Sequence, residues 1–66
     1  MEFKNKVVLA RAKLNISQTK LANLLHVSLT TISRWENGKV TPTKKDELLF
    51  AEFCRNVKIE FDEVME

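Results

Sequence analysis

The apolar residues near the start of the chain recur at the spacing of one helix face. Phe3, Val7, Ala10 and Leu14 follow one another at intervals of four, three and four, and side chains at these intervals share one side of an α-helix. The pattern predicts an amphipathic helix from about residue 2 to Leu14. We expect it to end at Asn15, because asparagine tolerates the left-handed backbone that ends many helices.

A second, shorter helix is predicted over Gln18–Leu25. Leu21, Ala22 and Leu25 fall on one face of it, so that face should be buried. Ser17 precedes the helix and can accept a hydrogen bond from an amide of the first turn that would otherwise be unpaired.

A third helix is predicted over Leu29–Glu36. Ile32 and Trp35 share its inner face, and Ser28 stands where Ser17 stands before the second helix. Only about three residues separate the second and third helices, a length that sets two helices at a steep angle. Residues from about 17 to 37 are therefore interpreted as a helix-turn-helix.

A fourth helix is predicted over about Lys44–Asn56. Gly38, the only glycine of the chain, supplies the left-handed residue that ends the third helix. Thr43 and Asp46 have the spacing of a capping box, with aspartate in place of the usual glutamate or glutamine.

The last third of the chain, from about residue 48 to residue 66, carries a surplus of large apolar residues. One interpretation is a self-association surface, with the domain forming a homodimer. The other is a short fifth helix over residues 61–65 that covers the core, and the two are compatible. The residues assigned to the dimer contact are Leu49, Phe53, Ile59 and Phe61.

Charge is distributed unevenly along the chain, although its net value is only +2. Residues 1–45 carry nine Lys and Arg against two Glu, a net charge of +7, whereas residues 46–66 carry two against seven, a net charge of −5. One end should be attracted to a polyanion and the other repelled by it, which would orient the domain on a nucleic acid.

The remaining chemistry favours a binding domain rather than an enzyme. The 66 residues allow one domain, and a chain of this size is near the lower limit for folding alone. Cys54 is the only cysteine and His26 the only histidine, so we expect no disulfide, no metal site, no cofactor and no catalytic triad. Without an export signal or an apolar run long enough to cross a membrane, the sequence predicts a cytoplasmic protein.

The helix-turn-helix residues resemble those of the phage-repressor and Cro-like (XRE-type) helix-turn-helix DNA-binding proteins. The resemblance covers residues from about 7 to 43 and departs from the family at two positions, where His26 and Asn15 stand in place of glycine. It is carried by Ser17-Gln18, Leu21-Ala22, Leu25, Val27-Ser28, Ile32-Ser33-Arg34-Trp35 and Glu36-Asn37-Gly38.

The resemblance implies an all-α, compact, lambda-repressor-like domain of four to five helices, and it gives a partner to Arg11. This arginine lies one residue from the apolar stripe of the first helix, and a partly buried guanidinium requires a carboxylate. In the family, the matching arginine pairs with the glutamate that corresponds to Glu36. We therefore expect an Arg11–Glu36 ion pair.

The resemblance also implies which residues touch DNA, and the side-chain chemistry agrees. Arg34 can bind the O6 and N7 atoms of guanine through two hydrogen bonds, Thr30 can donate or accept, and Leu29 can contact a thymine methyl group. The residues predicted to contact bases are Leu29, Thr30, Ser33 and Arg34. Those predicted to contact phosphates are Gln18, Ser28, Thr31, Asn37, Lys39 and Lys44.

Two functions fit this sequence. The first is a sequence-specific transcriptional regulator, a repressor or autoregulator, that binds a palindromic operator in double-stranded DNA as a homodimer. The second is an interaction module of the antitoxin type, which holds a protein partner and can also bind DNA. Arg34 and Thr30 in a basic field favour the first function, whereas the apolar surplus of the last third is what a partner would use.

Overall fold

Residues 1–61, which the computed structural model describes, fold into four helices joined by short connections. The helices are α1 (Phe3–Leu14), α2 (Gln18–Leu25), α3 (Leu29–Asn37) and α4 (Lys44–Asn56), and this part of the chain contains no strand. The predicted all-α fold is confirmed. A fifth helix over residues 61–65 would lie, apart from Phe61, outside the described residues.

Three of the four helices, α2, α3 and α4, begin at a residue whose side chain caps the first turn. The hydroxyl oxygens of Ser17 and Ser28 accept hydrogen bonds from amides in the first turns of α2 and α3, each at 3.1 Å. Thr43 and Asp46 form the complete capping box of α4. Gly38, in left-handed backbone at φ 70°, ends α3 one residue later than predicted, after Asn37.

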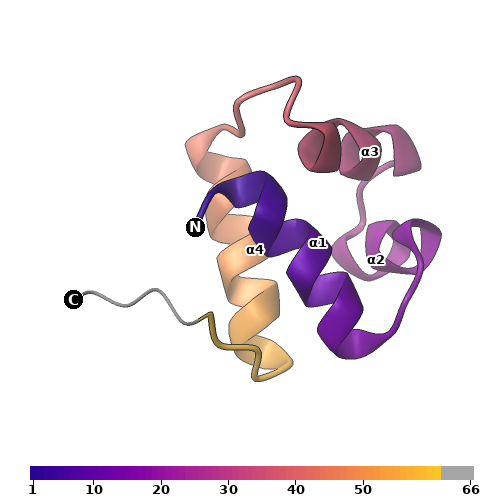
Figure 1. The fold of residues 1–66 in the computed structure, drawn as a ribbon, viewed down its shortest axis with the longest axis vertical. Coiled ribbons are helices and arrows are strands. Elements are labelled where there is room, and N and C mark those ends of the chain that lie inside the picture. The colour runs from indigo at the N-terminus through magenta and orange to yellow at the C-terminus, as the bar shows by residue number, and fades with distance from the viewer. Residues whose placement is uncertain (62–66) are drawn as a thin grey trace.

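The helices enclose one apolar core. Figure 1 shows α1 and α4 on one side of the molecule and α2 and α3 on the other. Both helices of the helix-turn-helix bury their inner faces completely, and α1 packs against α3. The buried residues are Val7, Ala10, Leu21, Ala22, Leu25, Ile32, Trp35, Phe50, Cys54 and Ile59.

An aromatic cluster joins α1, α3 and α4 within this core. The ring centroids of Phe3 and Trp35 are 5.1 Å apart, and those of Phe3 and Phe50 are 5.4 Å apart, both in edge-to-face geometry. Phe61, beyond the end of α4, reaches the same cluster at 6.4 Å from Phe50. Edge-to-face pairs stabilise a core beyond the area that they bury, so the cluster holds the end of α3 against α1 and α4.

The structure buries Ile59, one of the residues predicted to form the dimer contact. Ile59 is only 9% exposed and belongs to the core, while Phe53 and Phe61 pack partly buried against it. The cause is a reversal of the chain after α4, where Lys58 takes left-handed backbone at φ 62° and the amide of Ile59 donates to the carbonyl of Cys54 at 2.8 Å. Of the four residues assigned to the contact, Leu49 alone is exposed, at 36%.

Candidate nucleic-acid interface

The corner between α2 and α3 is a tight left-handed turn at His26. Its backbone has φ 60°, and its amide and that of Val27 donate to the carbonyls of Asn23 and Ala22 at the end of α2. Left-handed backbone is costly for a residue with a Cβ atom. His26 is tolerated because the two capping hydrogen bonds compensate for part of that cost.

This strain leads to a stability prediction. The His26→Gly variant should be more stable by about 0.5–1 kcal/mol, because glycine removes a penalty of about 1–2 kcal/mol for left-handed backbone but loses some conformational entropy on folding. Urea denaturation checks this, with Asn23→Gly in the helix interior as the control that should destabilise. A His26→Gly variant less stable than the parent would contradict the prediction.

A two-pronged ion pair fixes the end of α3 to α1. The Nε of Arg11 donates to Oε2 of Glu36 at 2.6 Å, and Nη2 donates to Oε1 at 3.0 Å. The remaining guanidinium nitrogen, Nη1, donates to the carbonyl of Ile16 in the connection before α2 at 3.2 Å. The expected Arg11–Glu36 pair is thus present, and it also ties down the segment that leads into the helix-turn-helix.

Gln18 supplies a third donor to the same carboxylate. Its Nε2 donates to Oε1 of Glu36 at 2.8 Å. Burial raises the pKa of Glu36, but the hydrogen bonds from Arg11 and Gln18 and the charge of Arg11 outweigh burial and hold this pKa below its usual range. The hydrogen bond to Glu36 raises the pKa of Arg11, so both groups are charged at neutral pH.

The outward face of α3 presents three of the four side chains predicted to read bases, and the fourth, Ser33, is half-buried. Leu29 is 48% exposed, and Thr30 and Arg34 are exposed as well, while Ile32 and Trp35 on the opposite side are buried. Within residues 1–61, the Arg34 guanidinium has no hydrogen bond or ion pair. An arginine held on a fixed helix with its donors unused is suited to a bidentate contact with guanine.

Two pairs of polar side chains form hydrogen bonds along α3, one in its first turn and one in its second half. The hydroxyl groups of Ser28 and Thr31 are 2.9 Å apart and share a hydrogen bond, in addition to the amide bond that caps the helix. At the other end, Nδ2 of Asn37 lies 3.5 Å from Oγ of Ser33. A hydroxyl can accept more than one hydrogen bond and an amide group has two N–H donors, so these residues keep capacity for another partner.

The lysines predicted to contact phosphate lie in different places. Lys39 is exposed just beyond the end of α3, whereas Lys44 lines a groove between α1 and α4, and the residues described there include none from α2 or α3. The side chain of Lys4, from α1, lies over the end of α3, a position that was not expected from the sequence. A Cβ atom built on Gly38 would be 2.9 Å from Cδ of Lys4, a long-range contact without a sequence signal.

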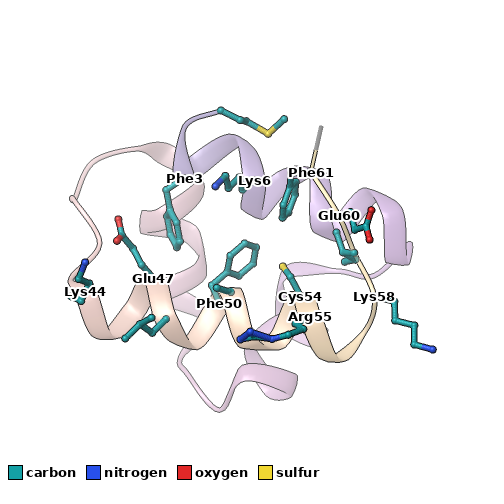
Figure 2. Close-up of a pocket in the computed structure, with 14 residues that line it drawn as sticks. Phe3, Lys6, Lys44, Glu47, Phe50, Cys54, Arg55, Lys58, Glu60 and Phe61 are labelled. Carbon is teal, nitrogen blue, oxygen red and sulfur yellow. The ribbon is translucent and has the colours of Figure 1, made fainter. Parts of the chain in front are cut away.

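The groove beside Lys44 has a volume of about 750 Å³. Figure 2 shows Phe3, Phe50 and Phe61 along it, with Lys44 and Glu47 at one end and Lys58 and Glu60 at the other. Cys54 also lines it, and burial raises the pKa of this thiol to about 11, although the charge of Lys6 acts in the opposite direction. At neutral pH the thiol is therefore protonated, which suits a core residue rather than a nucleophile.

Comparison with protein families identifies the architecture. The family model described as helix-turn-helix matches residues 9–61. This range contains the Arg11–Glu36 pair, the capped starts of α2 and α3, and the outward face of α3. The chain belongs to the XRE-type helix-turn-helix family of DNA-binding proteins. No helix within residues 1–61 is long and apolar enough to cross a membrane.

A curated relative has the same kind of domain. Over 53 residues, 80% of this chain, the sequence is 40% identical to the HTH-type transcriptional activator BcrR of Enterococcus faecalis. The match spans only 26% of that protein, so it concerns one part of the relative. No solved structure matches the chain significantly.

Proposed function

We propose that this helix-turn-helix domain binds a palindromic operator in double-stranded DNA as a homodimer and regulates transcription there. The observation that carries the proposal is the two-sided character of α3. Its inner side is buried and clamped by the Arg11–Glu36 pair, while its outer side carries Leu29, Thr30 and Arg34. Such a helix can enter a major groove without rearranging the core.

The first turn of α2 serves as the phosphate contact in this proposal. Ser17 caps the amide of Lys20, and the amides of Gln18 and Thr19 before it precede the first intrahelical hydrogen bond of α2. Amides at a helix start attract an anion. The basic character of residues 1–45 would add attraction that does not depend on DNA sequence and weakens as salt rises.

Repression is the action that we propose for this domain alone. Occupying an operator that overlaps a promoter is enough to block transcription, and it requires only DNA binding. The relative is named an activator, but the match spans only 26% of its length, so this part of its name is not carried over to the domain.

The proposal predicts that Arg34→Ala weakens operator binding by about 1–3 kcal/mol and relaxes the preference for one guanine, which is what one bidentate arginine contact is worth. The operator is first selected from random duplex DNA at a fixed salt concentration. Titration of operator and random duplexes with the wild type and with Arg34→Ala then gives the change in specific and in non-specific affinity.

Arg55→Ala is the matched control, because it removes an exposed arginine from α4 and changes the net charge equally. It should leave the base preference unchanged. Equal losses of operator and random DNA binding by Arg34→Ala would contradict a base-reading role. If the wild-type domain selected no sequence but retained a protein partner, the interaction-module function would replace the proposal.

A further inference from the structure

Gln18 has a structural partner that its position in the sequence does not suggest. It is the first residue of α2, where a phosphate contact is expected, yet its side-chain amide donates to Oε1 of Glu36 in the last turn of α3 at 2.8 Å. Oε1 also accepts from Nη2 of Arg11. One carboxylate therefore connects α1, the first turn of α2 and the end of α3.

We propose that Gln18 is a positioning residue, which acts through Glu36 to hold the start of α2 at a fixed orientation relative to α3. Because α2 carries the phosphate contact and α3 the base-reading face, this orientation determines whether both can engage one duplex. The inference rests on the proposed DNA-binding function and deepens it. It differs from a simple phosphate contact, in which Gln18 would touch only DNA.

One substitution distinguishes a positioning role of Gln18 from a direct contact with phosphate. Gln18→Glu keeps the shape of the side chain but replaces the donating amide with a carboxylate beside Oε1 of Glu36. Within residues 1–61, the charged groups that share this hydrogen-bond network are Glu36 from α3 and Arg11 from α1. Two neighbouring carboxylates cannot both ionise without cost, so one of them should retain a proton well above the ordinary glutamate pKa.

The expected result is a pH-dependent loss of function. At pH 8, Gln18→Glu should bind the operator at least about tenfold more weakly than wild type, because loss of a hydrogen bond to a charged group is worth at least that factor. At pH 5.5, the introduced carboxyl group can hold a proton and donate to Glu36 again. The affinity should then return to within about threefold of wild type, since the geometry of the bond is restored.

Thr19→Glu is the matched control, because Thr19 is the next residue, is exposed and has no hydrogen bond to Glu36. Its carboxylate would repel phosphate at both pH values and should show no recovery. All affinities are expressed relative to wild type at the same pH, which removes pH effects that the variants share with the wild type.

Thermal unfolding without DNA provides a second measurement that does not depend on the proposed function. The Tm of Gln18→Glu relative to wild type should be lower at pH 8 than at pH 5.5, whereas that of Thr19→Glu should not change with pH. Equal, pH-independent losses of affinity by both variants, with no pH effect on the Tm of Gln18→Glu, would overturn the positioning role. The two proposals can also fail separately. If neither the wild type nor the variants bound DNA selectively, but the Tm of Gln18→Glu still depended on pH as expected, the proposed function would be wrong and the Gln18–Glu36 link would be supported.

Discussion

Replacing Glu36 by alanine should destabilise the domain by about 3 kcal/mol, near the lower end of the cost of breaking a buried ion pair. The Glu36 side chain is 9% exposed and that of Arg11 is 25% exposed, so the guanidinium would lose its partner without becoming fully hydrated. The Gln18 amide would lose its acceptor as well. Urea denaturation followed by circular dichroism measures the change in the free energy of unfolding.

A double-mutant cycle shows whether this loss comes from the pair. If it does, Arg11→Ala and Glu36→Ala together should destabilise much less than the sum of the single losses. Additive losses would mean that the contact between the two side chains contributes nothing to stability.

Acid titration of the same pair gives an independent check. Because the pKa of Glu36 is lowered on folding, its ionised form stabilises the folded state above the ordinary glutamate pKa of about 4.3, and this contribution is lost as the pH falls through the lower folded-state value. A Glu36→Gln variant should therefore be less stable than wild type at pH 7. The difference in the free energy of unfolding between this variant and the wild type should become smaller below pH 4.

Most of the fold could be predicted because its local signals agree with its packing. Ser17, Ser28 and Thr43 mark the starts of three helices, and the spacing of apolar residues identifies the faces that the structure buries. The Arg11–Glu36 pair was also predictable, because a partly buried arginine requires a carboxylate and the family resemblance implied that Glu36 supplies it. These features depend on residues whose chemistry permits few alternatives.

The features that could not be predicted depend on the path of the chain through space. Lys58 takes left-handed backbone although it is neither glycine nor asparagine. The sequence therefore does not predict the reversal that brings Ile59 into the core. The bond from Gln18 to Glu36 joins residues eighteen positions apart, and it exists only because α2 and α3 cross at a particular angle. The same reversal of the chain takes Ile59 away from the surface on which the dimer contact was expected.

In the proposed dimer, α4 supplies the contact through its exposed apolar side chains. Leu48 is 63% exposed and Leu49 is 36% exposed, and Leu48 lies on the rim of the groove between α1 and α4. Substitutions at Phe53 or Phe61 would disturb the core of each monomer, so the two leucines offer the cleaner test. A contact here would leave α3 free, and a palindromic operator would require the two reading helices to lie about 34 Å apart, on successive turns of the duplex.

The double substitution Leu48→Lys and Leu49→Lys should lower affinity for the palindromic operator by about 100-fold or more, because one reading helix would act in place of two and each base pair read is worth about 1–3 kcal/mol. Lysine adds attraction to DNA, so the loss could not be attributed to charge repulsion. Val8→Lys, at an exposed apolar position of α1, adds the same kind of side chain elsewhere and should retain the affinity. Sedimentation should show two wild-type chains on each operator and one chain of the double variant on a half-site. A wild-type protein that is monomeric both free and on the operator would contradict the dimer.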